Sequence, residues 1–254
     1  HTRTLTICNT PEKGDDMTPN IRVIADPFQN AWNWHFRYAF NFLFYVPKRS
    51  PLPEALEESL RACTSKEAQL PLFLEWRTAE GDSEILAAAQ DSIQKEFAAK
   101  RDELFRRMLE VTWLEPYLPV YTCYLSTHYG SPYDPVHGCT WVYHKLDYAG
   151  RIGLFLHEYQ HMLVHHYFEQ EIVAQVGANG FQHIKEALTT LLNQWFTESF
   201  MGLPDLGYPM HKFLRAEIDE VWQQTGDFQK VIQHAVSVYP QFAKYHTLQP
   251  DEAK

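Results

Sequence analysis

Long apolar runs are missing from this chain of 254 residues. Its apolar stretches are interrupted by His, Asn, Arg or Lys well before the roughly 18 residues that a membrane-spanning helix requires, and no signal-peptide pattern opens the chain. Internal repeats and recognisable linkers are lacking as well. We therefore expect a soluble protein that folds as one compact unit, large enough to bury a substantial core.

Clustered positive charge and cysteine are also scarce. The formal net charge is -10 and no stripe of Lys and Arg is present, which argues against nucleic acids and membrane surfaces as partners. The cysteines lack C-x-x-C spacing and predict neither a disulfide framework nor a cysteine-rich zinc site; they are Cys8, Cys63, Cys123 and Cys139. Ordinary thiols slightly favour the cytoplasm, whereas a bridge between Cys123 and Cys139 is the alternative for an exported protein. Nothing indicates the oligomeric state.

One short segment, His157-Glu158-Tyr159-Gln160-His161, combines residue types that indicate metal chemistry. On an α-helix, positions i and i+4 share a face, so both imidazoles can reach one ion, while Glu158 lies beside any water on that ion. The flanking residues 152–156 and 162–164 are apolar enough to bury the helix. This pattern is typical of a zinc hydrolase. The competing interpretation is a buried helix whose histidines are satisfied by hydrogen bonds.

The rest of the chain predicts strands first and helices after. From Trp34 to Tyr45 aromatic residues alternate with other residues, a period of two that is typical of a strand with one core face. Further strands are expected at residues 72–76, 120–126 and 140–146, and helices at about 53–63, 82–111, 151–168, 181–200, 209–224 and 227–238, with breaks at Gly180, 202–207 and Gly226. This order predicts an α+β fold. A β-rich subdomain with a mixed sheet and a long helix would occupy residues 1–150, and a helical subdomain with the metal site would occupy residues 151–254.

Two imidazoles need a further protein ligand, because catalytic zinc sites normally supply three and leave the fourth position to water. The metzincin pattern would have Gly and His where this chain has Val164 and Tyr167. His165 lies one helical turn further on. A rigid helix carries it about 12 Å along the axis from His157, too far for both to bind one ion with bonds of about 2 Å. We therefore expect His165 beside the site or at the surface.

A carboxylate from the next helix suits the third position better. The segment 181–192 places Glu186 one helix after the motif. Ala187 and Leu188 follow it, and a small and an apolar residue there allow the two helices to pack closely. Glu186 is therefore a candidate for the third ligand.

At these residues the chain resembles the gluzincins, the thermolysin-like and peptidase-MA-like metallopeptidases. In that group the glutamate ligand is followed by a small residue and then an apolar one. The matching residues here are His157, Glu158 and His161 for the first motif and Glu186 for the second. A rival is Glu198, whose surroundings resemble the pattern of aminopeptidase-like gluzincins, although its separation from His161 is long for that group.

The resemblance covers roughly residues 140–238 and implies a zincin-like fold, a Zn²⁺ cofactor and hydrolysis of peptide bonds in a peptide or protein substrate. Glu158 would be the general base, and Tyr208 would polarise the scissile carbonyl, with His211 as the alternative. A hypothesis of another class is a zincin-shaped interaction or regulatory module whose metal is structural or absent. Glu158 argues against it, because a structural zinc site does not need a carboxylate that is not a ligand.

Overall fold

The computed structural model describes residues 18–39, 52–195 and 204–244. Its elements in chain order are β1 (Asn20–Ile24), α1 (Pro27–Ala39), α2 (Glu54–Ala62), α3 (Leu70–Ala79), α4 (Asp82–Thr112), β2 (Val120–Ser126), β3 (Tyr133–Asp134), β4 (Cys139–Tyr143), α5 (Tyr148–Leu188), α6 (Leu192–Trp195), α7 (Lys212–Thr225) and α8 (Phe228–Phe242), with short 3-10 turns at Glu67–Gln69, Thr189–Leu191 and Pro209–His211. The described part of the chain is mostly helical with one small mixed sheet, which confirms the α+β class.

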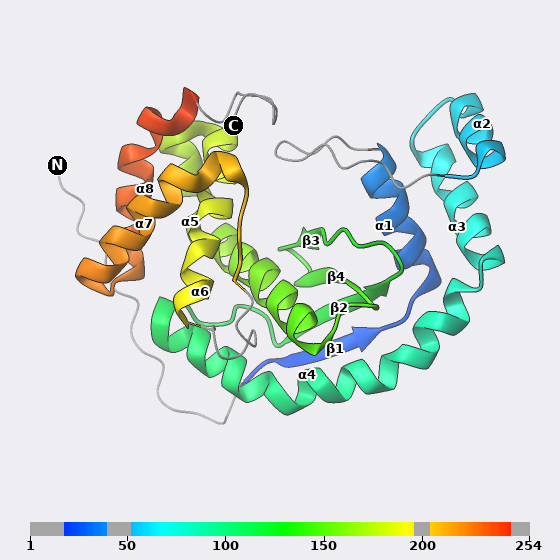
Figure 1. Cartoon of the computed structure of the whole chain (residues 1–254), viewed down its shortest axis with the longest axis horizontal. Helices are drawn as coiled ribbons and strands as arrows, with labels where there is room; N and C mark the ends of the chain where they lie inside the picture. Colours follow the sequence, from blue (N-terminus) through cyan, green and yellow to red (C-terminus); the bar gives the residue numbers. More distant parts are fainter. Residues whose placement is uncertain (1–17, 40–51, 196–203, 245–254) are drawn as a thin grey trace.

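The sheet has the strand order β1-β2-β4-β3. β1, β2 and β4 run parallel, and the two-residue strand β3 pairs antiparallel with β4 at one edge. In Figure 1 the long helix α4 runs below β1, and the first half of α5 lies beside the sheet. The second half of α5 lies next to α7 and α8.

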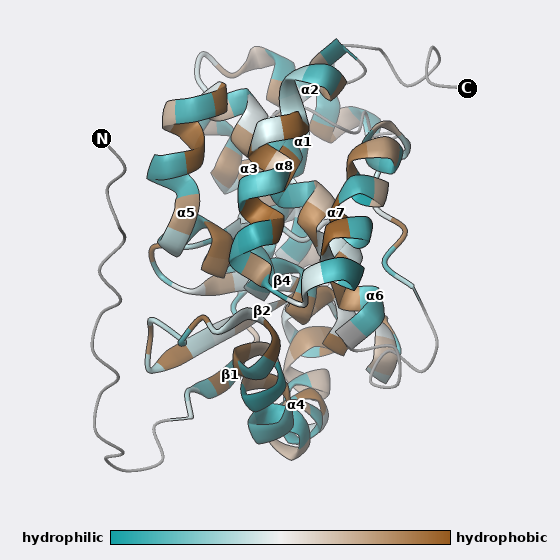
Figure 2. Ribbon diagram, turned by 90° about the vertical axis from the view of Figure 1, so that its left-hand side faces the viewer, coloured by the Kyte–Doolittle hydropathy of each residue, from teal (hydrophilic) through white to brown (hydrophobic). Residues whose placement is uncertain are grey.

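Apolar side chains from these elements meet in one core. On α4 the buried residues Ile93, Phe97, Leu104 and Met108 recur at helical spacing, so that one face of the helix is apolar. The ring of Phe97 lies 5.4 Å from that of Phe155 on α5. Figure 2 shows hydrophilic and hydrophobic residues alternating around the helices, as in helices that each bury one side.

Two of the predicted strands are wrong. Residues 34–39 belong to helix α1, while residues 40–45 lie outside the described part of the chain. Asp26 starts α1, because its carboxylate accepts hydrogen bonds from the backbone amides of Phe28 and Gln29. Residues 72–76 lie in helix α3. On this helix Phe73 is fully buried, and Leu72, Leu74 and Trp76 are partly buried around it.

Most of the other predictions of secondary structure are confirmed. Helices α2, α4, α7 and α8 and strands β2 and β4 lie where they were expected, within a few residues. The helices predicted at 151–168 and 181–200 instead form one helix, α5, with a sharp kink at Gly177 rather than a break at Gly180. Residues 196–200 lie outside the described part. Cys123 and Cys139 are free thiols on neighbouring strands. None of the described helices combines the length and the apolar character needed to cross a membrane.

Candidate metal centre

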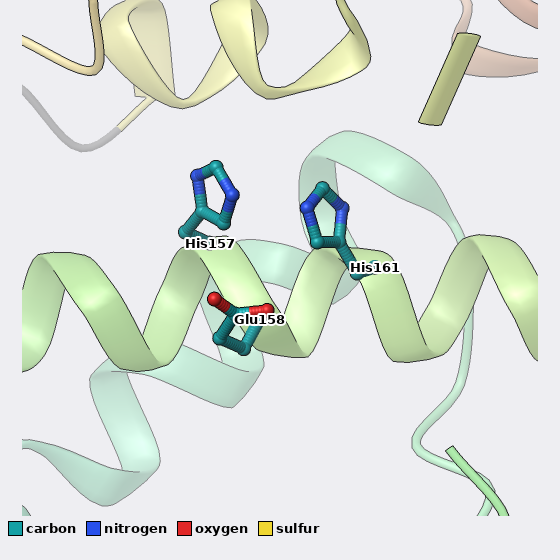
Figure 3. A group of neighbouring side chains, drawn as sticks. All are labelled: His157, Glu158 and His161. Atoms are coloured by element: carbon teal, nitrogen blue, oxygen red, sulfur yellow. The ribbon is translucent and has the colours of Figure 1, made fainter. Parts of the chain in front are cut away.

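The motif residues lie in the middle of the first half of α5. The helix begins after Asp147, whose side chain accepts a hydrogen bond from the backbone amide of Gly150 at 2.8 Å. Figure 3 shows His157 and His161 projecting from the same side of the helix, with Glu158 on the adjacent part of the helix surface. The centroids of the two imidazole rings are 4.4 Å apart. The sequence spacing thus produces the expected pair on one face.

Glu186 approaches both histidines from the second half of α5. Its Oε1 lies 3.3 Å from His161 Nε2, and its Oε2 lies 3.6 Å from His157 Nε2. In a straight helix Glu186 would be about 37 Å from His161 along the axis. The kink at Gly177 returns the helix to the motif, because its φ of 76° and ψ of 168° are far from helical values.

These distances suit a tetrahedral metal ion. With bonds of 2.0–2.1 Å to nitrogen and oxygen, two ligand atoms of a tetrahedral zinc ion are about 3.3 Å apart. One ligand atom from each of His157, Glu158 and His161 also lies within 4.8 Å of the other two. We favour Glu186 as the third ligand, because its oxygens lie 3.3 and 3.6 Å from the two Nε2 atoms.

The buried imidazole of His161 bears on whether the site suits a cation. Its side chain is 1% exposed, its Nδ1 has no hydrogen-bond partner in the described structure, and its Nε2 has only the 3.3 Å contact with Glu186 Oε1. Burial lowers the pKa of His161 to about 3, so the ring is neutral and Nε2 can present a lone pair. A buried polar atom without a partner is costly and is usually explained by a ligand, an ion or water. The three residues therefore fit a metal ion such as zinc.

A carboxylate that sequence reasoning missed orients the first histidine. Asp205 Oδ2 lies 2.6 Å from His157 Nδ1. Asp205 is itself fixed by hydrogen bonds from Thr189 Oγ1 at 3.0 Å and from Arg215 Nη1 at 3.2 Å. A histidine that donates Nδ1–H to a carboxylate turns its Nε2 towards the ion. The loop that contains Asp205 was interpreted only as a break between helices, and its position beside His157 has no local sequence signal.

Glu158 and Tyr208 border the same cavity as the proposed ligands. The cavity has a volume of about 880 Å³, and His157, Glu158, His161, Glu186 and Tyr208 are among its lining residues. Glu158 is 6% exposed, and burial raises the pKa of its carboxyl to about 7. Its environment therefore brings the proton affinity of this carboxylate close to neutrality.

The alternative residues take different positions. His165 borders the cavity beside the ligand group, as expected. Its Nδ1 lies 3.3 Å from Glu169 Oε2. His211 is fully buried, and its Nε2 lies 2.9 Å from His183 Nδ1. Its ring packs edge-on against the ring of Tyr208, with the two centroids 5.7 Å apart. Glu198 lies outside the described residues.

Lys185 and Tyr133 are two further residues that the sequence did not single out. Lys185 Nζ lies 3.0 Å from Glu186 Oε1 and donates a hydrogen bond to the hydroxyl of Tyr133 at 2.8 Å. Burial alone would lower the pKa of Lys185, but Glu186 and Tyr133 raise it, so the ammonium stays charged. A permanent positive charge therefore lies next to the proposed ligand carboxylate.

No family model, curated protein or solved structure matches this chain, so its function has to be inferred from this geometry.

Proposed function

We propose that the chain is a zinc-dependent peptidase of the gluzincin type. The observation that carries this proposal is the convergence of three potential ligand groups, His157 Nε2, His161 Nε2 and the Glu186 carboxylate, at separations of 3.3 and 3.6 Å. The arrangement of the fold agrees with a zincin-like architecture. A mixed sheet with an antiparallel edge strand borders the active-site helix, and the glutamate follows on the next helical segment.

A zinc ion held by these residues would lower the pKa of a water molecule and polarise the carbonyl of a peptide. Glu158 would take one proton from the water as its oxygen attacks the carbonyl carbon. The same carboxyl would then pass that proton to the amine nitrogen as the C–N bond breaks. Asp205 would hold the His157 ring in the orientation that the ligand set requires.

The cavity agrees with a peptide as substrate. Its volume of about 880 Å³ lies within the range of roughly 300–1,000 Å³ that is usual for ligand sites. Apolar and aromatic residues such as Phe36, Leu154 and Tyr129 line it beside the polar groups. A peptide offers both a carbonyl for the ion and side chains for these walls. The overall negative charge makes nucleic acid an unfavourable substrate.

The test is a comparison of Glu158→Gln with wild-type protein purified without added metal. We expect about one zinc per chain in both, and cleavage of a peptide mixture by the wild type only, because the amide keeps the shape of the base but cannot take the proton. Glu169→Gln, an exposed carboxylate on the same helix, should retain full activity. Equal cleavage by Glu158→Gln would exclude Glu158 as the base.

A non-catalytic module is the second candidate, and Lys185 is the observation that favours it. Its ammonium gives Glu186 a counter-charge at 3.0 Å, so the cluster could remain neutralised without a metal ion. Zinc that stays near zero after addition of excess zinc would support this candidate, as would bound zinc without any peptide cleavage. His161→Ala should lose the metal if the peptidase proposal is correct.

A further inference from the structure

Tyr133 reaches the proposed catalytic cavity from the edge of the sheet. It lies on β3 opposite Thr140 of β4, at the side of the sheet that faces α5. The centroid of its ring is 5.3 Å from the ring of His161. Glu158 lines the same cavity. The hydroxyl of Tyr133 therefore lies near the proposed ligands, in the wall of the cavity that the proposed base also lines.

The direction of the hydrogen bond with Lys185 determines what this hydroxyl can still do. An ammonium group only donates hydrogen bonds, so the oxygen of Tyr133 is the acceptor at 2.8 Å. This is the one hydrogen bond that the described part of the chain gives to that hydroxyl. The hydrogen on the tyrosine oxygen thus remains to be donated, and the cavity is the space next to it.

Lys185 holds the tyrosine and increases its strength as a donor. Its ammonium lies 4.7 Å from the centre of the Tyr133 ring and is fixed on its other side by Glu186. Lys185 is 3% exposed, so water screens its charge little. A hydroxyl that accepts a hydrogen bond from a cation is polarised and donates more strongly. Lys185 is in this sense a positioning residue for Tyr133.

Tyr208 is the other tyrosine that lines the cavity, and it was the oxyanion candidate from the sequence. Its ring lies against His211, with the two ring centroids 5.7 Å apart. The hydroxyl of Tyr133 accepts a hydrogen bond from the Lys185 ammonium. This cation prepares the hydroxyl of Tyr133 to stabilise a developing negative charge.

We propose that Tyr133 is the residue that donates a hydrogen bond to the carbonyl oxygen of the scissile peptide. The inference depends on the peptidase function proposed above. As the water oxygen bonds to the carbonyl carbon, the π electron pair of the C=O bond moves to the carbonyl oxygen, and the O–H of Tyr133 points to that oxygen. When the C–N bond breaks, the pair returns to the C=O bond and the amine leaves with the proton from Glu158.

The experiment compares Tyr133→Phe with Tyr208→Phe and with Tyr117→Phe as a matched control. The hydroxyl of Tyr117 donates a hydrogen bond to the backbone oxygen of Pro135 at 2.5 Å. Pro135 directly follows β3, so this control removes a tyrosine hydroxyl that holds the segment next to Tyr133. For Tyr133→Phe we expect kcat to fall by about 10²- to 10³-fold, as for the loss of one oxyanion donor, with KM and zinc content unchanged. Tyr117→Phe should keep kcat and lose only thermal stability.

A binding measurement separates this role from a structural one. A peptide phosphonamidate carries a tetrahedral phosphorus with a negative oxygen at the position of the oxyanion. Tyr133→Phe should bind it about 10²-fold more weakly than the wild type, while binding of the cleavage product stays the same. Lys185→Gln leaves the hydroxyl and removes the charge, so we expect a smaller loss of kcat, about 10-fold, with zinc still bound.

The outcomes distinguish the two proposals. If the wild type cleaves peptides and both Tyr133→Phe and Lys185→Gln do so at the wild-type kcat, the assignment of Tyr133 is overturned and the peptidase proposal stands. A loss of kcat and of phosphonamidate affinity in Tyr208→Phe instead of Tyr133→Phe would likewise transfer the role to Tyr208. If the zinc-loaded wild type cleaves no peptide and binds no phosphonamidate, the peptidase proposal and this inference fail together.

Discussion

Asp205 Oδ2 lies 2.6 Å from His157 Nδ1, while Nε2 of the same ring faces Glu186. Burial alone lowers the pKa of His157, but the hydrogen bond with Asp205 and the nearby Glu186 carboxylate raise it well above its ordinary value. The proton on Nδ1 is thus held by Asp205, and a cation would replace the one on Nε2. Asp205 in turn has a pKa of about 2, because its contacts with His157 and Arg215 outweigh its burial. It is therefore an ionised carboxylate at neutral pH.

Replacement of Asp205 by Ala should weaken zinc binding without abolishing it. The expected increase in the zinc Kd is about 10- to 100-fold, the usual effect of removing a carboxylate that orients a ligand histidine. Asp219→Ala is the matched control. Asp219 accepts hydrogen bonds from Thr190 and Gln194, away from His157, so its removal should leave the zinc Kd unchanged. Competitive zinc titration measures both.

Zinc titration of Asp205→Ala, combined with thermal melting, also tests whether Asp205 orients His157. Asp205→Ala also deprives Arg215 of a carboxylate partner, so the metal-free protein should melt at a lower temperature. A variant that melts lower but binds zinc with the wild-type Kd would show that Asp205 serves only the packing of α7.

Glu186→Ala should lower the affinity for zinc by orders of magnitude, because it removes both a bond to the ion and a neutralising charge. The parallel variant is Glu198→Ala, which tests the other glutamate that the sequence allows. The distances of 3.3 and 3.6 Å to the two histidines favour Glu186. Loss of zinc in Glu198→Ala and retention in Glu186→Ala would make our ligand assignment wrong while leaving a gluzincin site. If neither variant changes the zinc Kd, the resemblance to gluzincins is misleading.

Local patterns predicted the parts of the fold that depend on near neighbours in the sequence. The histidine pair, the long helix α4 and the strands β2 and β4 follow from periodicity and turn residues over short windows. The pair of histidines needed only the i, i+4 geometry of a helix. These features did not require knowledge of distant contacts.

The strand predicted from Trp34 failed because aromatic residues contact neighbours on more than one side of α1. Trp32 stacks on Trp141 of the sheet at 4.4 Å, whereas Trp34 packs edge-on against Trp76 of α3 at 5.1 Å. A helix enclosed between a sheet and another helix carries large residues on several faces. Its sequence can then imitate the alternation of a strand, and local periodicity does not separate the two.

The rest of the site depends on tertiary structure. Tyr133, Lys185 and Asp205 come from an edge strand, the second half of α5 and a loop. They approach the histidines because of how these segments pack. No short-range spacing relates them to the motif. The approach of Glu186 is equally a tertiary property, since it depends on where α5 bends.

That bend leads to a prediction about Gly177. Its φ of 76° and ψ of 168° lie in a region that is essentially restricted to glycine, and no atom within 4 Å would clash with an added Cβ. Any effect of Gly177→Ala therefore comes from backbone strain alone. We expect a loss of about 1–3 kcal/mol in the free energy of unfolding.

The kink also positions Glu186, so Gly177→Ala should weaken zinc binding as well as stability. The alanine favours a straight helix, and a straight helix carries Glu186 away from His161. Ala174→Gly is the control, since it changes an exposed position of the same helix one turn earlier. It should cost about 1 kcal/mol of stability through helix propensity and leave the zinc Kd unchanged. Urea unfolding measures the stability of both variants, and zinc titration measures their zinc Kd. If the two lose equal stability and both keep the wild-type zinc Kd, the bend at Gly177 does not hold the glutamate in place.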